Sequence, residues 1–324
     1  MPAILLSAPY MIPTLERFRP VFAQYGMEVI VPDVRERMEE GDLLPYAGQV
    51  DGAVCGDDRY SAAVLERFAP RLKVISKWGT GIDSIDRQAA ARLGIQVRNT
   101  PNAFTLPVAD TVMGYMLAFV RRLPWMDQQV KAGIWDKIPG RSLSECTLGV
   151  IGVGNIGKAV MRRARGFGMK LLGTDIIPIA PDFILENGVE MTTLEDLMRR
   201  ADFISVNCDL NSTSHHIINA ASLSWCKPAA VVINTARGPL VDEPALVDAL
   251  RAGKIGGAAM DVFEIEPLPQ DSPLLSMDNV MLAPHNANSS PSAWERVHWN
   301  TLRNLVEGLG LDPSPLSAFQ RIKD

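Results

Sequence analysis

The amino-acid sequence predicts an α/β protein with two domains, each built on a doubly wound parallel sheet. Short apolar runs alternate with segments of helical periodicity along nearly the whole chain, which is typical of parallel strands joined by helices. The length of 324 residues suits two domains at roughly 150 residues each. A long helical pattern followed by a polar stretch separates one series of strands from the next, so we expect one sheet on each side.

The first series contains five apolar runs rich in β-branched and aliphatic residues, as buried strands are. Segments of helical period at 14–24 and 61–68 lie between these runs. A long helix is expected at 106–122, because Pro107 suits a first turn and Pro124 would stop the helix. The five expected strands are 3–7, 28–31, 51–55, 73–77 and 96–99.

The second series follows a polar segment at 131–145 that is interpreted as a connecting loop. One of its helices is expected to open with a capping box formed by Thr192 and Glu195. A last helix at 292–309 comes after the final strand, and we expect it to return to the first domain, which would make that domain discontinuous. The six expected strands are 147–152, 170–175, 203–207, 230–234, 258–262 and 280–283.

Composition excludes several classes of protein. With 47% hydrophobic and 21% charged residues, the chain is not disordered as a whole. The net charge of −5 gives no electrostatic footprint for nucleic acid or an anionic membrane. The N-terminus has no basic leader, and no apolar run reaches the ~18 residues of a membrane span. The scattered cysteines predict neither a disulfide frame nor a metal site, and they favour a cytoplasmic location; they are Cys55, Cys146, Cys208 and Cys226.

The most informative local motif is a GxGxxG between an expected strand and an expected helix. Gly152 would permit the tight turn, Gly154 would let the backbone approach a pyrophosphate, and Gly157 would let the helix pack on the strand. The first helical N–H groups, at Asn155 and Ile156, would face the phosphates together with the positive end of the helix dipole. The motif predicts a dinucleotide-binding domain.

The strand that follows the glycine motif ends in Asp175. A carboxylate at this position can accept hydrogen bonds from both hydroxyls of the adenosine ribose and would repel a 2′-phosphate. The next three residues are Ile176, Ile177 and Pro178, so no arginine follows to bind such a phosphate. We therefore expect NAD rather than NADP as the cofactor.

Three polar segments come at the carboxyl ends of later strands, where ligands bind in open α/β sheets. Hydride exchange between a nicotinamide and a 2-hydroxy acid needs a base for the hydroxyl proton, a cation for the carboxylate and a group that keeps the base poised. His285, Arg237 and Glu266 are residues of the right types. The three segments are 233–243, 258–269 and 279–287.

Together with the glycine motif and the stretch SKWGTGIDSID at 76–86, these segments resemble the D-isomer-specific 2-hydroxyacid dehydrogenases over nearly the whole chain. The strings NTARGPLVDE and DVFEIEPLP are long and specific to that family. The resemblance implies that His285 is the general acid and base, that Glu266 orients it and favours the imidazolium, and that Arg237 binds the substrate carboxylate and carbonyl oxygen. Within the family, the phosphoglycerate dehydrogenase branch is nearest, in a short form without an appended regulatory domain.

The resemblance also implies further binding residues. Asp261 would receive the carboxamide of the nicotinamide, and the backbone of Thr80 and Gly81 would hold the substrate carboxylate. Several other positions would line the cofactor; they are Thr111, Cys208, Thr235 and Ala236.

The same resemblance implies a flavodoxin-like substrate domain at 1–100, completed by 289–324, and a Rossmann NAD domain at 101–288. A cleft between the domains would hold the chemistry, and its closure would exclude water. A homodimer is expected, with much of its interface supplied by the long helix and by the segment that contains Trp125 and Trp135.

The substrate remains open between a phosphorylated and an unphosphorylated acid. The resemblance favours a 3-phosphoglycerate dehydrogenase-like enzyme, and Lys77 is a candidate ligand for the phosphate. Cys55 stands where that branch tends to carry an arginine, and Asp57 and Asp58 would repel a phosphate unless Arg59 or Arg141 compensates. A glyoxylate, hydroxypyruvate or general 2-keto acid reductase is the alternative, and an NAD-sensing scaffold or corepressor is a distant one.

The chain departs from the family pattern at several positions, among them Ser84, where an asparagine is usual. The residues after His285 are Asn-Ala-Asn, where the family usually has a glycine-containing run, and Asp209 stands where a proline is common. His215 and His216 are interpreted as surface-loop residues, and His298 as a packing or interface residue.

Overall fold

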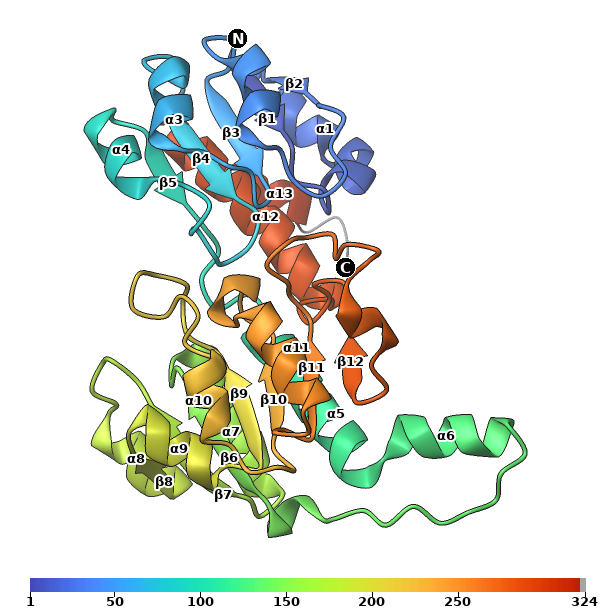
Figure 1. Ribbon diagram of the computed structural model, residues 1–324. Coiled ribbons are helices and arrows are strands. Elements are labelled where there is room, and N and C mark those ends of the chain that lie inside the picture. The colour runs from blue at the N-terminus through green and yellow to red at the C-terminus, as the bar shows by residue number, and fades with distance from the viewer. Residues whose placement is uncertain (321–324) are drawn as a thin grey trace. The chain divides into compact units, whose positions relative to one another are not determined.

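The computed structural model describes residues 1–320 and divides the chain into two compact units (Figure 1). One consists of Met1–Phe104 with Ser290–Asp324 and is called here the five-stranded domain; the other is Thr105–Ser289, the seven-stranded domain. The last four residues of the predicted segment 289–324 lie outside the described residues. Both sheets are entirely parallel, and the predicted α/β fold class is confirmed.

The five-stranded sheet has the order β2-β1-β3-β4-β5, which is the flavodoxin-like arrangement. Its strands are β1 Ala3–Leu6, β2 Glu28–Ile30, β3 Gly52–Cys55, β4 Val74–Lys77 and β5 Gln96–Arg98. The helices of this domain are α1 Leu15–Gln24, α2 Glu40–Leu43, α3 Ala62–Phe68, α4 Arg87–Arg92, α12 Pro291–Gly308 and α13 Leu316–Gln320, with 3-10 turns η1 Ile12–Thr14 and η2 Leu44–Tyr46.

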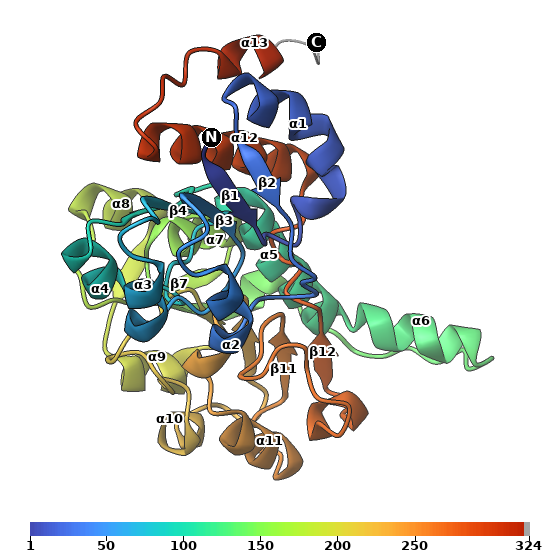
Figure 2. The ribbon, with the colours of Figure 1, turned by 90° about the horizontal axis from the view of Figure 1, so that it is seen from above.

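Helix α12 follows the seven-stranded domain in sequence and packs on the five-stranded sheet (Figure 2). A side chain at Gly308 would collide with Val74 of β4, so this glycine allows the close approach. The hydroxyl of Ser76 donates a hydrogen bond to the carbonyl oxygen of Thr301 at 2.8 Å. His298, also on α12, is buried and accepts a hydrogen bond at Nδ1 from the indole of Trp78 at 2.9 Å. In this domain His298 therefore fills the core.

The seven-stranded sheet has the order β12-β11-β10-β9-β6-β7-β8, which is a Rossmann arrangement with one additional strand. The strand order reverses between β6 and β9, and a dinucleotide binds at such a switch point. Its strands are β6 Thr147–Ile151, β7 Lys170–Thr174, β8 Val189–Met191, β9 Phe203–Val206, β10 Val231–Asn234, β11 Gly257–Met260 and β12 Val280–Leu282.

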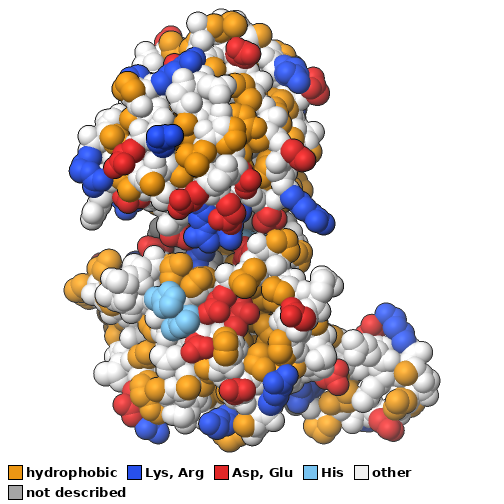
Figure 3. Space-filling view, turned by 45° about the horizontal axis from the view of Figure 1, so that its top comes forward, with side chains coloured by type: hydrophobic (Ala, Val, Ile, Leu, Met, Phe, Trp, Pro, Cys, Tyr) orange, Lys and Arg blue, Asp and Glu red, His pale blue; other side chains and the backbone are white. Residues whose placement is uncertain are grey.

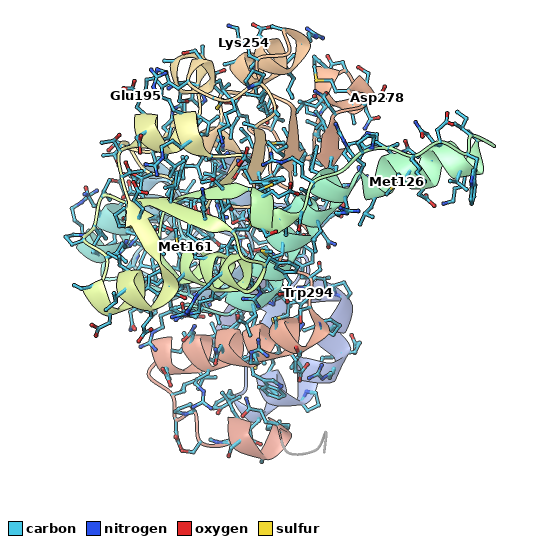
Figure 4. The ribbon with its side chains drawn as sticks, turned by 90° about the horizontal axis from the view of Figure 1, so that it is seen from below. Met126, Met161, Glu195, Lys254, Asp278 and Trp294 are labelled. Atoms are coloured by element: carbon cyan, nitrogen blue, oxygen red, sulfur yellow. The ribbon has the colours of Figure 1, made fainter. Side chains whose placement is uncertain are left out.

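Helices cover both faces of the seven-stranded sheet. Helices α5, α7 and α8 pack on one face through Val112, Val160 and Phe183, and Figure 4 labels Met161 of α7 in this layer. Helices α9, α10 and α11 pack on the other face. The helices are α5 Thr105–Arg121, α6 Leu123–Lys131, α7 Asn155–Gly166, α8 Pro181–Asn187, α9 Leu194–Arg200, α10 Ala220–Ser224 and α11 Glu243–Arg251, with 3-10 turns η3 Leu143–Glu145, η4 Gly238–Leu240 and η5 Pro273–Ser276.

The structure corrects three details of the predicted elements. Pro124 does not end the helical region. The long helix α5 ends just before Arg122, where φ is +57°, and a second helix, α6, then begins with Pro124 in its first turn. Strand β8, at the sheet edge, was not predicted. The N-cap of α9 is Thr193, whose side chain accepts from the backbone N–H of Asp196, so Thr192 is not the capping residue that the predicted capping box requires.

Within residues 1–320, the longest apolar helices fall short of what crossing a bilayer requires. The same residues contain no group of three or more His, Cys, Asp or Glu side chains arranged to hold a metal ion.

Candidate active site

The glycine motif forms the turn between β6 and α7. Gly152 has φ of +90°, and a Cβ there would lie 2.5 Å from the backbone nitrogen of Cys208. A Cβ at Gly157 would collide with the carbonyl oxygen of Gly152. Glycine is therefore required at both positions. At Gly152 the turn touches the segment that follows β9, and at Gly157 the first turn of α7 packs against the end of β6.

Gly154 differs from these two glycines, because a Cβ at this position would meet nothing within 4 Å. It is the N-cap of α7 and provides no capping side chain, and Gly154 and Asn155 are both exposed while Ile156 is partly buried. The start of a twelve-residue helix thus faces an open space. This arrangement fits the pyrophosphate of a dinucleotide, which binds helix N-termini through backbone N–H groups.

Asp175 lies at the carboxyl end of β7 beside the glycine turn. Its Oδ2 accepts a hydrogen bond from the N–H of Val153 at 2.7 Å, and its Oδ1 accepts one from Ile177 at 2.9 Å. A carboxylate oxygen has two lone pairs, so each oxygen can still accept a hydrogen bond from a ribose hydroxyl. The two backbone contacts hold the carboxylate beside the glycine turn.

Two buried polar atoms at the ends of β9 and β10 have no hydrogen-bond partner within the part of the chain that the structure describes: Oδ1 of Asn207 and Oγ1 of Thr235. Leaving such an atom unpaired costs about 1–3 kcal/mol, so a ligand with polar groups would relieve the cost. Cys208 lies beside them, and burial raises the pKa of its thiol to about 11. It therefore presents a neutral side chain at pH 7. Thr235 and Cys208 are among the residues predicted to line the cofactor, whereas Asn207 is not.

Arg237 lies in the turn that follows β10. The buried Asn234 holds this turn, because its Oδ1 accepts from the N–H of Ala236 at 3.1 Å and its Nδ2 donates to the carbonyl oxygen of Arg237 at 2.8 Å. The guanidinium donates to the carbonyl oxygen of Ala236 at 2.7 Å. Asn234 thus acts as a positioning residue that the sequence analysis missed, although it stands directly at the strand end.

Glu266 and His285 meet as the motif predicts. Oε2 of Glu266 lies 3.0 Å from Nδ1 of His285, and Oε1 accepts a hydrogen bond from the N–H of Phe263 at 2.9 Å. Both side chains are about one-fifth exposed, at 19% and 21%. A carboxylate on Nδ1 fixes the tautomer of a neutral imidazole, and Nε2 is then the nitrogen that can exchange a proton with a substrate.

Asp261 holds the loop that carries His285. Its two carboxylate oxygens accept from the N–H groups of Asn286 at 2.7 Å and Ala287 at 2.9 Å, and its carbonyl oxygen accepts from the N–H of His285 at 2.7 Å. Burial raises the pKa of Asp261. The loop is strained, since His285 has φ of +52°. On α5, Thr111 reaches the same loop, with its hydroxyl 3.4 Å from the carbonyl oxygen of Ala287.

The loops that carry Arg237 and Glu266 touch each other through their backbones. A Cβ at Gly238 would collide with the carbonyl oxygen of Phe263 and with the neighbouring peptide. Only glycine allows this approach, which the sequence analysis did not predict. The seven-stranded domain therefore brings Arg237, Glu266 and His285 to loops at one edge of its sheet, held by backbone contacts.

The predicted substrate residues Lys77, Thr80 and Gly81 belong to the five-stranded domain. Lys77 is buried, and its ammonium group lies 3.0 Å from Oδ1 of Asp57 and donates to the carbonyl oxygen of Trp78 at 3.2 Å. The hydroxyl of Thr80 donates to the carbonyl oxygen of Thr100 at 3.0 Å, and Gly81 is partly exposed. The positive charge of Lys77 is thus balanced inside its own domain.

Asp58 is fully buried next to this pair. Its carboxylate accepts hydrogen bonds from the hydroxyl of Ser7 and from the N–H of Met38, the latter at 2.8 Å. Burial raises the pKa of Asp58 to about 6. This carboxylate connects β1, the loop after β3 and the segment before α2, so it has a structural role.

Comparison with known proteins gives a consistent result. The family described as D-isomer specific 2-hydroxyacid dehydrogenase, NAD binding domain, matches residues 113–287. A glyoxylate reductase from Korarchaeum cryptofilum is 40% identical over 255 residues, which cover 77% of this chain and 76% of that protein. A D-3-phosphoglycerate dehydrogenase from Methanocaldococcus jannaschii is 41% identical over 265 residues, covering 81% of this chain but only 48% of that protein.

Solved structures agree with these sequence matches. D-Lactate dehydrogenase from Aquifex aeolicus, crystallised with NAD and lactic acid, superposes with a TM-score of 0.80 at 28% identity, over 93% of each chain. The glycine turn, the carboxylate of Asp175 at the end of β7 and the paired glutamate and histidine are all present in the structure described above. The chain belongs to the D-isomer specific 2-hydroxyacid dehydrogenase family, and its seven-stranded domain contains the family's NAD-binding domain.

Proposed function

We propose that this protein uses NAD(H) to interconvert a small unphosphorylated 2-keto acid and the corresponding D-2-hydroxy acid. The contact between Glu266 and His285 at 3.0 Å supports the reaction, because it combines a proton-exchanging imidazole with a carboxylate that orients it. The pairing of Lys77 with Asp57 supports the substrate class. A phosphate carries −1.5 to −2 charges near neutral pH and needs a cation that is not already neutralised.

The proposed roles follow from the positions of the side chains. His285 protonates the carbonyl oxygen during reduction and takes the proton back during oxidation, and Glu266 stabilises the imidazolium. Arg237 binds the carboxylate of the substrate and polarises the carbonyl through its planar fork of N–H groups. Bound NADH supplies the hydride in the reducing direction. Thr80 and Gly81 are proposed to bind the substrate carboxylate as well.

The proposed cofactor site extends over the carboxyl end of the seven-stranded sheet. The pyrophosphate would lie over Gly154 and the first N–H groups of α7, and Asp175 would accept hydrogen bonds from the ribose. The hydroxyl of Thr235 would donate or accept a hydrogen bond with the cofactor, and this bond would satisfy Oγ1, which has no partner among residues 1–320. The remaining residues proposed to contact the cofactor are Gly152, Asn155, Ile156, Gly157, Thr111, Cys208, Ala236 and Asp261.

A 3-phosphoglycerate dehydrogenase is the second candidate, favoured by the 41% identity to the enzyme of that name from Methanocaldococcus jannaschii. The substrates of the two candidate enzymes differ in whether they carry a phosphate group. Rates of NADH oxidation at neutral pH, measured with glyoxylate, hydroxypyruvate, pyruvate and phosphohydroxypyruvate, distinguish the two functions.

We expect kcat/KM for the best unphosphorylated acid to exceed that for phosphohydroxypyruvate by at least about tenfold, which corresponds to about 1.4 kcal/mol. The variant Asp57→Asn releases the charge of Lys77 and is expected to narrow this gap. A wild-type preference for phosphohydroxypyruvate would refute the proposed substrate class while leaving the reaction class in place.

We also propose that the protein forms a homodimer. Helix α6 and the segment after it extend from the rest of the seven-stranded domain, with Met126 labelled on α6 in Figure 4. Trp135 is 89% exposed, and Val130 and Ile134 are about half exposed. Large apolar side chains gathered on one exposed segment favour burial against a partner. Sedimentation velocity should give twice the mass of one chain, and the mass of a single chain would contradict the dimer.

The predicted cytoplasmic location, the predicted absence of a nucleic-acid partner and the predicted cleft between the domains remain predictions.

A further inference from the structure

His216 lies in the loop between β9 and α10 and contacts both catalytic loops of the seven-stranded domain. Its backbone N–H donates to the carbonyl oxygen of Pro239, two residues after Arg237, at 2.9 Å. Its Nε2 lies 2.6 Å from Oε1 of Glu264, two residues before Glu266. The sequence analysis interpreted His216 as a surface-loop residue, but two-thirds of its side chain is covered.

The loop of His216 is fixed to the segment that follows Arg237. Ile218 donates its N–H to the carbonyl oxygen of Leu240 at 3.0 Å and accepts from the N–H of Asp242 at 2.8 Å. The carbonyl oxygen of His216 accepts from Nδ2 of Asn219 at 2.8 Å. His216 itself has φ of +51°, a conformation that the surrounding contacts must maintain. Its imidazole is therefore held in one place.

Glu264 belongs to the turn that positions Glu266. Its N–H donates to Oε1 of Glu243, on α11, at 2.6 Å, while the preceding N–H, of Phe263, donates to Oε1 of Glu266 at 2.9 Å. The other carboxylate oxygen of Glu266 lies against His285. One short path of contacts thus leads from His216 through Glu264 and its turn to the imidazole that exchanges the proton.

Three carboxylates share this small region, and two of them influence the third. Burial raises the pKa of Glu243, and the charges of Glu264 and Glu266 raise it further. Figure 3 shows histidine side chains, in pale blue, beside acidic side chains on the surface of this domain. The charged or titratable groups around the His216–Glu264 pair are His215 on the same loop, Glu243 on α11, Glu266 and His285 on the neighbouring loops, and Arg237 after β10.

We propose that His216 is a positioning residue for proton transfer, which fixes the Glu266 turn by holding Glu264. The inference rests on the proposed roles of Glu266 and His285. It assigns the 2.6 Å contact a function in tuning the acid and base chemistry, in addition to its contribution to folding.

The test removes the contact and the charge of Glu264 separately. His216→Asn shortens the side chain and loses the contact to Glu264, so kcat should fall. Glu264→Gln can keep a hydrogen bond to His216 and should keep kcat within about twofold. Reduction of a keto acid requires the imidazolium of His285, so activity falls on the basic side of the pH profile of kcat, and the loss of a negative charge in Glu264→Gln should move this basic limb to lower pH. Asparagine is chosen at residue 216 because it tolerates a positive φ.

The matched control for the charge change is Glu186→Gln, which removes an exposed carboxylate of α8 on the other face of the sheet and should leave the profile unchanged. We expect kcat of the His216→Asn variant to fall about threefold to tenfold at the optimum, with the KM for NADH unaltered. A general loss of structure would raise the KM for NADH as well.

The inference is overturned if His216→Asn keeps the wild-type kcat, if its KM for NADH rises as kcat falls, or if Glu264→Gln loses as much kcat as His216→Asn. Thermal denaturation checks that each variant is folded, and if His216→Asn is not, Glu264→Leu, which also removes the contact, decides by the same measurements of kcat and KM. Failure of the proposed function gives a different result, because His285→Ala would then retain wild-type turnover.

Discussion

The two domains both place charged side chains where parallel strands end, but they use them differently. In the five-stranded domain, Lys77 is buried against Asp57, and its charge is balanced at 3.0 Å. In the seven-stranded domain, Glu266 lies at the same distance, 3.0 Å, from His285. One pair neutralises a buried cation, whereas the other orients an imidazole, the kind of side chain that can both give and take a proton.

Two buried aspartates make the same contrast. Asp58 and Asp261 each accept two hydrogen bonds, and burial raises the pKa of both. The donors differ: Asp58 binds groups from the domain's own framework, while Asp261 binds the two N–H groups that follow His285. A buried carboxylate therefore becomes functionally important through the segment that it holds, and its burial alone does not distinguish the two cases.

The strongest way to break this contrast is to remove the titratable member. His285→Ala should lower kcat by about 10²–10⁴-fold, the usual contribution of general acid and base catalysis. The affinity for NADH, measured by fluorescence titration, should change little because the glycine turn and Asp175 are untouched. Glu186→Ala, at an exposed position of α8, serves as the control. Turnover at the wild-type rate would remove His285 from the mechanism.

The geometry of the cation is tested by Arg237→Lys. The charge is kept, but the planar fork that grips a carboxylate with two hydrogen bonds is lost. We expect kcat/KM for the keto acid to fall by about 30–100-fold, equivalent to about 2–3 kcal/mol, while the affinity for NADH is retained. A variant with wild-type kinetics would contradict the assigned role.

The cofactor end of the seven-stranded sheet is tested by Asp175→Ala. Losing two ribose hydrogen bonds should weaken NADH binding by about tenfold, or roughly 1.4 kcal/mol. NADPH should bind better than it does to the wild type, because the repulsion of its 2′-phosphate is removed. Measuring KM for both cofactors checks this expectation, and an unaltered preference would disprove the ribose contact.

The smallest expected effect is on stability and concerns Asp58. The pKa of Asp58 is about 6 in the folded protein, above the ordinary aspartate value of 3.8 that is expected in the unfolded chain. The folded state therefore binds the proton more tightly than the unfolded state does. The free energy of unfolding should therefore rise as the pH falls from about 6 towards 4, by about 2 kcal/mol from this group. Asp58→Asn should remove that contribution, as judged by urea denaturation at several pH values. An identical pH dependence in both proteins would contradict the assignment.

The sequence predicted most of the fold because its strands are buried on both faces and appear as apolar runs. Strand β8 has only three residues, with burial that decreases from Val189 to an exposed Glu190, and such a strand leaves no pattern. Helix α6 was missed because a proline can end one helix or sit in the first turn of the next. Only the backbone conformation of Arg122 decides between the two.

The site divides in a similar way. Glu266 and His285 could be predicted because both stand in segments that resemble the family's motifs. The structure places the two side chains 3.0 Å apart. The function proposed for His216 could not be predicted, because its contact with Glu264 joins two loops far apart in the sequence and becomes visible only in the folded sheet. Asn207 and Asn234 gave no signal beyond their places at strand ends.

The backbone contact at Gly238 has a consequence for how such proteins diverge. Since the backbone of Phe263 leaves no room for a side chain at Gly238, the segments that carry Arg237 and Glu266 are in direct backbone contact, and a change in one requires a matching change in the other. A loop exchanged alone between two relatives would meet a partner shaped for a different neighbour. Chimeras that transfer both segments together should stay active where single-loop chimeras fail, and natural changes in substrate range should arise in the two segments as one inherited block.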